Sequence, residues 1–418
     1  MDKISRLRGF RDIWKDELEK LRKIEEVARK YLNLLGFDEL KVPILEKTEL
    51  FVRSIGETTD IVQKEMFTFH DPSGDSVTLR PEATAGVVRA YIEASLFATQ
   101  RITKLFTIGS MFRHERPQKG RFREFNQIDV EVFGSKGPLI DAELLWLISL
   151  ILDELKVKNF EIEVNTVGCW ECRKKFKEVF LSYIEKKLDH LCEDCKTRAR
   201  RNPLRIFDCK KDECLFLTKD SPLLFENLCE ECKIHFNKFL NYLIKFEVKV
   251  KHNERLVRGL DYYTKTVFEV KSSALGAQNA FIAGGRYDGL VKEMGGPDVP
   301  GIGFAIGLER LSLIVNTGNP KENLTVFIAF VDDKAREHLF RLVKQFVKSN
   351  IRVFYDPDSK SLKSQMRYAH ALNADYAIIV GEEEIKNNIV SLRNMKTGEQ
   401  KSYPNDLEYL IKDISYTK

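Results

Sequence analysis

Cysteine is missing from most of this chain: all 8 cysteines lie between Cys169 and Cys232. The sequence also lacks an apolar run long enough to span a bilayer, and its first residues, MDKISRLRGFRDIWKDE, are charged throughout, unlike a signal peptide. These absences predict a cytoplasmic protein without a membrane partner. A large net charge is missing as well, since +5 over 418 residues is compatible with a polyanionic partner but too small to indicate one.

The length and composition are those of a globular protein with several domains. With 418 residues, 43% hydrophobic and 31% charged, the chain is long enough for two or three domains, each with its own core. After Pro320, strands at 324–330, 351–355 and 376–380 alternate with helices at 333–348 and 362–372, which predicts a separate α/β domain with a largely parallel sheet. No glycine-rich nucleotide loop follows its first strand, so we interpret it as a binding module.

The cysteines occur in pairs, at Cys169/Cys172, Cys192/Cys195, Cys209/Cys214 and Cys229/Cys232. Three pairs are CxxC, a spacing that lets two thiolates reach one tetrahedral Zn²⁺. In a cytosolic chain, paired cysteines favour metal or thiol chemistry over disulfides. The sequence predicts one zinc site from Cys192, Cys195, Cys229 and Cys232, with the other pairs forming a second site or remaining free. The alternative is a set of reduced thiols that pack as small apolar residues.

A long antiparallel hairpin is predicted at residues 104–134, KLFTIGSMFRHERPQKGRFREFNQIDVEVFG. Its first strand leads through a turn-rich loop at 117–120 into a strand that alternates through Phe125, Gln127, Asp129 and Glu131. The hairpin carries a row of charges, namely Arg113, His114, Glu115, Arg116, Arg121, Arg123 and Glu131. Such a row is costly to bury unless each charge is paired or meets a ligand. The alternative is a solvated edge hairpin whose charges suppress aggregation.

The region before the hairpin contains a predicted helix and a predicted boundary strand. Residues 12–35 have apolar side chains at helical spacing, and Gly36 is placed to end the helix. The extended piece 39–45 contains Pro43, which belongs at a strand edge or bulge. This piece is therefore either an ordinary edge strand or part of a surface between subunits.

A turn signal, DPSGD at 71–75, precedes a strand-to-helix corner. Glu82 begins the helix, and Thr84 lies in its first turn. A carboxylate and a hydroxyl at such a corner either hold an ammonium group or cap the helix, and the residues alone favour capping.

The second half of the chain adds an insertion and three glycine-containing peptides. Residues 166–245 are predicted to form an insertion with its own small core. In RGLDYYT, 258–264, a glycine beside an arginine and two tyrosines predicts a turn that brings these side chains into one pocket. GGRYDG, 284–289, is predicted as a plain turn. GIGFAIGLERL, 301–311, predicts a glycine-rich strand and a helix that opens near Gly307 and carries Arg310.

Together these motifs resemble the class II aminoacyl-tRNA synthetases and, within that class, the histidyl-tRNA synthetase family. The helix and strand around Pro43 resemble the dimer-interface motif, FRHERPQKGRFREFNQIDVEVFG the ATP-binding hairpin, and GIGFAIGLERL the third motif. RGLDYYTKTVFEV and GGRYDGL are similar to peptides specific to the histidine enzymes. One departure is Ala83: residues 81–84 read Pro-Glu-Ala-Thr, whereas the bacterial pattern reads Pro-Glu-Gly-Thr.

The resemblance covers essentially the whole chain and implies an α+β fold. Its parts are an antiparallel-sheet catalytic core (1–165 and 246–320), a helical Cys-rich insertion (166–245) and a C-terminal α/β anticodon-binding domain (321–418). It implies a homodimer that attaches L-histidine to tRNA(His) through a histidyl-adenylate, using ATP with Mg²⁺ and releasing AMP and pyrophosphate. Zn²⁺ is suggested by the cysteines alone.

The resemblance also implies roles for individual residues. Arg113 and Arg258 are implied to be catalytic, because they face the charge that develops on the α-phosphate. The implied ATP site contains Arg113, Glu115, Arg121, Phe125 on the adenine and Arg310 on the γ-phosphate. The implied histidine site contains Glu82, Ala83, Thr84, Arg113, Gln127, Glu131, Arg258, Tyr262 and Tyr263, with the α-amino group at Glu82, Thr84 and Gln127 and the imidazole between Glu131 and Tyr263. Arg116 and Gln118 are either contacts to the tRNA acceptor end or solvated loop residues.

A second hypothesis is a catalytically silent relative, the regulatory subunit of ATP phosphoribosyltransferase. Such proteins share the synthetase core but lack the anticodon domain and disrupt the RGLDYY peptide. Both features are present here, so the sequence favours the enzyme.

Overall fold

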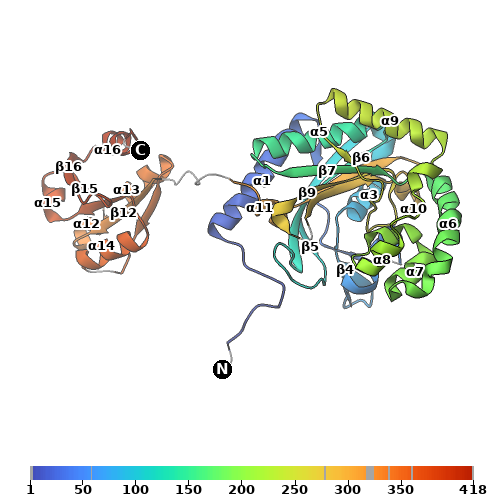
Figure 1. The fold of residues 1–418 in the computed structure, drawn as a ribbon. Coiled ribbons are helices and arrows are strands. Elements are labelled where there is room, and N and C mark those ends of the chain that lie inside the picture. The colour runs from blue at the N-terminus through green and yellow to red at the C-terminus, as the bar shows by residue number, and fades with distance from the viewer. Residues whose placement is uncertain are drawn as a thin grey trace. The chain divides into compact units, whose positions relative to one another are not determined.

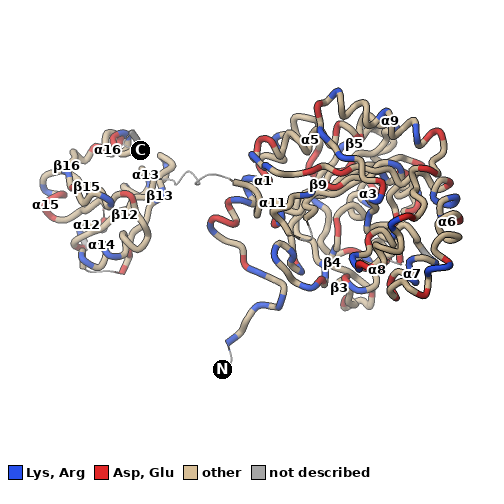
Figure 2. The backbone as a smooth tube through the Cα atoms, in the orientation of Figure 1, with Lys and Arg blue, Asp and Glu red and all other residues tan. Residues whose placement is uncertain are grey.

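The computed structural model describes residues 3–57, 59–276, 279–316, 324–337, 339–358 and 361–416. The chain divides into two compact units, Met1–Thr317 and Gly318–Lys418 (Figure 1). This boundary lies close to the predicted one at 320/321. Lys and Arg are interspersed with Asp and Glu along both units (Figure 2). Within the described residues, no helix combines the length and apolar character that a membrane span needs.

The N-terminal unit is built on one eight-stranded sheet. Its spatial order is β1 (Asp38–Glu39), β5 (Thr103–Phe112), β6 (Glu124–Phe133), β11 (Gly301–Gly307), β10 (Ala280–Arg286), β9 (Thr264–Ser272), β7 (Phe160–Thr166) and β8 (Lys251–His252). The six central strands pair antiparallel, and only the two short edge strands pair parallel. The predicted long hairpin is confirmed as β5 and β6.

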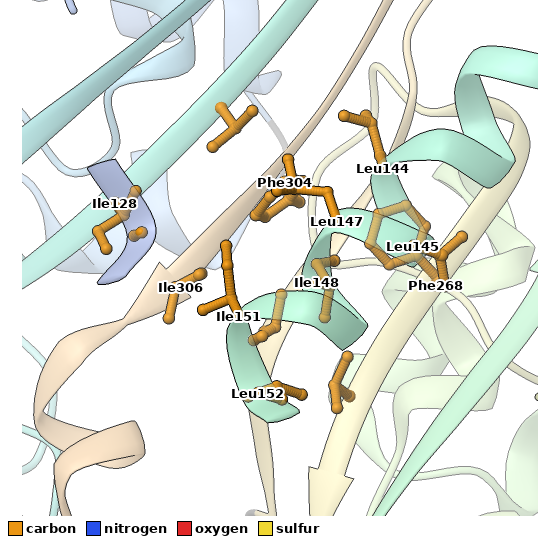
Figure 3. Packing of buried hydrophobic residues seen from close by; sticks show 14 of the residues in the cluster. Ile128, Leu144, Leu145, Leu147, Ile148, Ile151, Leu152, Phe268, Phe304 and Ile306 are labelled. Atoms are coloured by element: carbon orange, nitrogen blue, oxygen red, sulfur yellow. The ribbon is translucent and has the colours of Figure 1, made fainter. Parts of the chain in front are cut away.

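One face of this sheet is covered by helices. These are α1 (Lys15–Leu34), α5 (Pro138–Glu154), α9 (Glu230–Lys245) and α11 (Leu308–Ser312). Figure 3 shows α5 side chains such as Leu144 and Ile148 packed against Ile128, Phe304 and Ile306 of the strands. Alternate residues of β6 and β11 supply this core because side chains along a strand alternate between its faces.

The opposite face carries smaller elements. They are α2 (Thr48–Ile55), the π-helical turn η1 (Ile61–Glu65), α3 (Thr84–Glu93), α4 (Leu96–Thr99), α10 (Leu290–Glu293) and a small sheet ordered β2 (Leu45–Lys47), β4 (Ser76–Leu79), β3 (Phe67–His70). The predicted strand at 39–45 is wrong, because β1 ends at Glu39 and β2 begins at Leu45, in another sheet. Pro43, which has no N–H to donate to a ladder, lies between them.

Residues 184–228 of the insertion are mostly short helical turns. The insertion contains α6 (Trp170–Ile184), η2 (Glu185–His190), α7 (Glu193–Arg201), η3 (Pro203–Asp208), α8 (Asp212–Leu217), η4 (Leu224–Asn227) and α9. Its buried Phe176 and Phe180 belong to the same cluster as Tyr91 and Tyr263 of the catalytic core. The prediction of a separate small core is therefore wrong. The apolar residues of α6 to η4 pack onto the second face of the main sheet unit, and those of α9 join the helix layer on the first face.

The C-terminal unit is a five-stranded sheet with helices. The order is β13 (Arg352–Tyr355), β12 (Thr325–Phe330), β14 (Tyr376–Val380), β15 (Ile389–Asn394) and β16 (Gln400–Pro404). The helices are α12 (Asp333–Glu337), α13 (Leu339–Lys348), α14 (Leu362–Ala371), α15 (Glu382–Lys386) and α16 (Leu407–Tyr416). The first three strands are parallel as predicted, but β15 and β16 are antiparallel. The five-residue β15–β16 loop allows only that direction, since a parallel pair needs a long crossover.

Candidate active site

A cavity of about 250 Å³ lies on the face of the large sheet opposite α5, and we call it the central cavity. The sequence predicts one pocket for Arg113, Arg258 and Glu131, and the structure brings all three into this cavity. Other predicted residues that line it are Glu82, Thr84, Glu115, Arg121, Phe125, Gln127, Tyr262, Tyr263 and Arg310. Residues far apart in the sequence thus meet because β5, β6, β9, β10 and β11 are neighbours in the sheet.

Strand alternation explains the floor of the cavity. Gln127, Asp129 and Glu131 of β6 line it, whereas Ile128 and Val130 between them lie in the helix-covered core. On the neighbouring strand Gly303 pairs with Glu131, and a Cβ built there would stand 1.8 Å from a Glu131 carboxylate oxygen. The glycine therefore provides the space that the Glu131 side chain occupies.

The carboxyl group of Glu131 is held by two hydroxyl groups. Thr84 Oγ1 donates to Glu131 Oε1 at 2.6 Å, and the Tyr287 hydroxyl donates to Glu131 Oε2. Burial raises the pKa of Glu131 to about 8, even though these two hydrogen bonds favour the carboxylate. Tyr287 is thus a site residue that the sequence analysis assigned only to a turn.

Asp129 and Gln127 hold buried polar atoms without partners. Asp129 Oδ2 and Gln127 Oε1 have no hydrogen-bond partner among the described residues. Burial, reinforced by the nearby carboxylate of Glu82, raises the pKa of Asp129 to about 8. Buried polar atoms in folded proteins are nearly always satisfied, so these two indicate a place for a polar ligand.

Glu82 caps a helix. Its carboxylate accepts hydrogen bonds from the backbone N–H groups of Thr84 (2.8 Å) and Ala85 (3.0 Å) at the start of α3. Burial still raises the pKa of Glu82. The capping that the sequence favours is therefore present, and Glu82 also lines the central cavity. Ala83 is fully buried beside it but does not line the cavity.

Three arginines and an aromatic ring line the cavity on the hairpin side. Arg113 Nε donates to the Pro81 carbonyl at 2.8 Å, and its guanidinium lies 5.4 Å from the Phe125 ring centroid. Arg121 pairs with Glu115 at 2.6 Å. Burial, followed by the neighbouring charge of Arg121, lowers the pKa of Arg310 to about 10. Cations are thus concentrated at this side.

Arg258 reaches the same cavity from the segment before β9. It forms an ion pair with Glu269, and its Nε has no partner among the described residues. Burial alone would lower the pKa of Arg258, but the neighbouring Glu269, Tyr263 and Asp208 together outweigh it and the pKa is raised. The rings of Tyr262 and Tyr263 lie beside it, 4.7 Å apart.

Besides Ala83, two further predicted residues lie outside the cavity. Arg116 and Gln118 are exposed on the loop between β5 and β6, where the Gln118 backbone pairs with Arg121. The GGRYDG peptide is also not a plain turn. Gly284 to Arg286 belong to β10, and Arg286 is fully buried in an ion pair with Asp141 of α5. A buried arginine needs such a carboxylate partner, and the local peptide does not reveal it.

Sequence reasoning missed Asp129, Glu269 and Tyr287 as site residues. Alternation along β6 could have found Asp129, because it lies between Gln127 and Glu131 on the same face. Glu269 could not be found, because its contact with Arg258 depends on how the chain folds back at 258–264. Tyr287 reaches Glu131 across β11, a pairing that only the sheet order supplies.

The predicted cysteine set is wrong. The structure groups Cys169, Cys172, Cys229 and Cys232 in one place and Cys192, Cys195, Cys209 and Cys214 in another. Spacing identifies which two cysteines share a local turn, but not which pairs meet after folding. None of these eight described cysteines forms a disulfide.

Comparisons with known proteins agree with this geometry. Residues 9–311 match the family described as histidyl-tRNA synthetase, and residues 325–413 match the anticodon binding domain. A histidine–tRNA ligase of Trichlorobacter lovleyi is 47% identical over 397 residues, which is 95% of each chain. The apo histidyl-tRNA synthetase structure from S. aureus has a TM-score of 0.81 at 32% identity and covers 98% of this chain and 99% of that one.

A further solved structure shows how widely the fold is shared. An ATP phosphoribosyltransferase regulatory subunit/histidyl-tRNA synthetase from Bacillus halodurans has a TM-score of 0.65 at 19% identity, covering 91% of this chain and 99% of that one, and it shows the fold alone. The family match and the 47% identity show more. This chain belongs to the histidyl-tRNA synthetase family of class II aminoacyl-tRNA synthetases, ligases that charge tRNA with histidine.

Proposed function

We propose that the chain attaches L-histidine to tRNA(His) in two steps, through a histidyl-adenylate, with release of pyrophosphate and then AMP. One observation carries the proposal: a single cavity joins two arginines from distant parts of the chain, Arg113 and Arg258, to a floor of buried carboxyl and amide groups on β6. Cations on one side suit a triphosphate, and acceptors on the other suit an amino acid with an ammonium group and an imidazole.

In the first step a carboxylate oxygen of histidine attacks the α-phosphorus of ATP. A new P–O bond forms, and the bond from this phosphorus to the bridging oxygen breaks, so that both electrons leave with pyrophosphate. Negative charge builds up on the non-bridging oxygens during this displacement. Arg113 and Arg258 are the groups we assign to that charge, because fixed cations that face it stabilise the transition state. Their anchors, Pro81 and Glu269, hold them without reorganisation.

ATP is expected to enter with Mg²⁺ bound to its phosphates. Oxygen ligands suit this ion, and carboxylates of Glu115 and Glu269 line the cavity. Both carboxylates are already paired, Glu115 with Arg121 and Glu269 with Arg258. We therefore expect the phosphates of ATP and water to supply most of the ligands of Mg²⁺.

The rest of the ATP site is assigned by the same logic. Phe125 offers a ring face for the adenine, and Arg121 and Arg310 offer charge to the triphosphate. Arg310 remains a cation at neutral pH, since its lowered pKa is still about 10. Glu115 positions Arg121 through their ion pair.

Histidine is assigned to the floor of the cavity. Gln127 Oε1 and Asp129 Oδ2 are free acceptors for the α-ammonium group, and Glu82 and Thr84 lie beside them. We place the imidazole between Glu131 and the phenol of Tyr263, with Tyr262 alongside. Buried polar groups of this kind reject side chains that leave them unpaired, and such sites discriminate by roughly 10⁴ or more.

The second step brings the terminal ribose hydroxyl of tRNA to the adenylate carbonyl. Arg116 and Gln118 are exposed on the hairpin loop, where an acceptor end can reach them. The C-terminal unit is assigned to the anticodon, in agreement with its family match. We expect the reaction in the cytoplasm.

A homodimer is part of the proposal. Ile44 and Leu45, next to Pro43, are 47% and 42% exposed, respectively. Apolar side chains this exposed at the edge of a small sheet suit a surface between subunits.

Histidine-dependent exchange of pyrophosphate into ATP, run against a panel of other amino acids, tests the proposal. We expect exchange with histidine alone, and no exchange in well-folded protein would contradict it. The same result would favour the alternative of a silent regulatory subunit, which the intact 258–264 peptide and the anticodon domain at 325–413 argue against.

A further inference from the structure

The eight cysteines form two compact sets of four. Within each set, all four Sγ atoms lie within 4.8 Å of one another. The two sulfur atoms are 3.5 Å apart in Cys169 and Cys172 and 4.0 Å apart in Cys192 and Cys209. A tetrahedron with Zn–S bonds of about 2.3 Å places its sulfurs about 3.8 Å apart. The spacing in both sets therefore fits four thiolates around one ion.

We propose that each set binds one Zn²⁺ in a closed tetrathiolate site. The first site is formed by Cys169, Cys172, Cys229 and Cys232, and the second by Cys192, Cys195, Cys209 and Cys214. Among the common divalent ions, Zn²⁺ is the one that four thiolates in a tetrahedral arrangement favour. Because the protein fills all four ligand positions, none is left for a substrate. Both sites are therefore structural.

Local structure prepares the sulfurs for a cation. The first cysteine of each CxxC pair is the N-cap of a helix: Cys169 for α6, Cys192 for α7 and Cys229 for α9. Backbone N–H groups at a helix start point outward and, with the helix dipole, favour the thiolate that a metal requires. All three helices have nine or more residues.

Hydrogen bonds also join the two pairs within each set. The backbone N–H of Cys229 donates to Cys172 Sγ at 3.1 Å, and that of Cys192 donates to Cys214 Sγ at 3.4 Å. N–H groups that donate to sulfur are the usual second layer around metal-bound thiolates. Simple packing of thiols as small apolar residues does not require such contacts, so they favour the metal over the thiol-core alternative.

The first site joins the two ends of the insertion. It links the start of α6, where the chain leaves the catalytic core after β7, to the start of α9, which leads back to it. Gly168, next to the ligand Cys169, contacts β9. Its carbonyl accepts a hydrogen bond from the backbone N–H of Lys265 in β9 at 2.8 Å. A metal here closes a long loop, which stabilises the fold chiefly by restricting the unfolded chain.

The second site supports the segment that carries Arg258. Its ligands enclose α7 and η3, and two residues between Cys195 and Cys209 hold this segment. Asn202 Nδ2 donates to Asp261 Oδ1 at 2.7 Å, and Arg205 donates to the Gly259 carbonyl at 2.7 Å. Figure 1 shows α6, α7 and α8 grouped together in green beside the sheet. The second metal therefore positions Arg258 and Tyr263 for histidine activation, a consequence that rests on the proposed function.

Metal analysis of the full-length protein, purified with a reductant and without chelator, tests the two sites directly. We expect about two zinc ions per chain and a tetrahedral thiolate spectrum when Co²⁺ replaces zinc. Zero or one metal per chain in folded protein, with the remaining cysteines freely titratable as thiols, would overturn the proposal. This measurement needs no variant and does not depend on activity.

Paired variants assign the ions to the sites. Cys172→Ser/Cys232→Ser and Cys195→Ser/Cys214→Ser are each expected to retain one zinc. Glu193→Gln, an exposed residue between two ligands with 88% side-chain exposure, is the matched control and should retain both. Two zinc ions retained in either double variant would overturn the assignment, and a variant that fails to fold leaves the wild-type metal content as the deciding result.

Exchange kinetics separate the second site from the proposed function. In Cys195→Ser/Cys214→Ser we expect KM for histidine to rise roughly tenfold or more, with a smaller change in KM for ATP, as for other second-layer supports. Unchanged KM values with one zinc lost would contradict the supporting role. Zinc-loaded wild-type protein without any exchange would instead remove the proposed function and leave both metal sites standing.

Discussion

The two faces of β6 and β11 differ in what their side chains do. On the helix-covered face, Ile128, Val130 and Ile306 are fully buried among apolar neighbours, and every contact favours folding. On the cavity face of β6, Asp129 and Glu131 are buried and Gln127 is partly buried, and one polar atom each of Gln127 and Asp129 lacks a partner among the described residues. In β6, the even-numbered residues therefore stabilise the fold, and the odd-numbered residues line the cavity.

This difference predicts which substitutions affect stability and which affect function. Unsatisfied buried polar groups destabilise the free protein, and natural sequences retain them where a ligand uses them. Changes on the core face should lower stability and leave substrate recognition intact. Changes on the cavity face should reduce binding or turnover at little or no cost in stability.

Arg258→Ala should give the largest effect on activity. Loss of one charged donor to the transition state typically lowers the rate by about 10²–10³-fold. We expect that loss in the exchange rate, with histidine affinity mostly retained because the floor of the cavity is unchanged. Steady-state exchange with separate kcat and KM values measures it.

Arg255→Ala is the matched control for that variant. Arg255 lies three residues away, donates to the Thr218 carbonyl at 2.6 Å and does not line the central cavity. Its exchange rate should be near normal. Near-normal turnover in Arg258→Ala would remove this residue from the catalytic role.

Ile128→Val tests the core face at the middle of the same strand. Removal of one buried methylene usually lowers the free energy of unfolding by about 0.5–1.5 kcal/mol. Urea unfolding should show that loss, while KM for histidine stays unchanged. A changed KM with unchanged stability would mean that the two faces are not separate in the way the packing indicates.

Asp129→Asn tests the cavity face through the number of protons released when histidine binds. Because burial raises the pKa of Asp129 to about 8, its carboxyl is mostly protonated at pH 7 in the free protein. An ammonium group beside it favours the carboxylate, so histidine binding should release protons. Calorimetry in buffers of different ionisation enthalpy should show the release in wild type and a smaller one in Asp129→Asn, and equal release in both would exclude Asp129 as the titrating group.

The pH dependence of stability gives a smaller effect. Glu131 and Asp129 keep their protons in the folded protein up to a pKa of about 8, whereas in the unfolded chain they lose them near their ordinary values of 4.5 and 3.8. Between those limits the folded state binds more protons, so their contribution to stability falls as pH rises. Stability of Asp129→Asn should therefore fall less steeply than that of wild type between pH 5 and 8, and an identical slope would contradict the raised pKa.

Much of the fold follows from local sequence patterns. The hairpin, the first helix and the strand–helix alternation after residue 320 were predictable because each has a strong period and clear turn residues. Gly36 ends α1 with φ +76°, as expected for a glycine that terminates a helix. Alternation along β6 predicted which of its residues share a face.

What the sequence did not reveal depends on contacts between distant segments. The partner of Glu131 is Tyr287, the partner of Arg286 is Asp141, and Cys229 meets Cys172. None of these contacts leaves a local signal, because each is decided by sheet order and by how the insertion folds back. Roles within the cavity, such as those of Tyr263 and Arg310, remain predictions.

Thermal unfolding of Glu131→Gln at pH 8, with and without saturating histidine, tests whether the buried carboxyl group of Glu131 recognises the substrate. We expect the variant without ligand to be at least as stable as wild type, since a neutral amide resembles the protonated carboxyl. We also expect that histidine no longer raises its melting temperature as it does in wild type. A variant that is less stable than wild type but still stabilised by histidine to the same extent would contradict the assignment of this buried carboxyl group to substrate recognition.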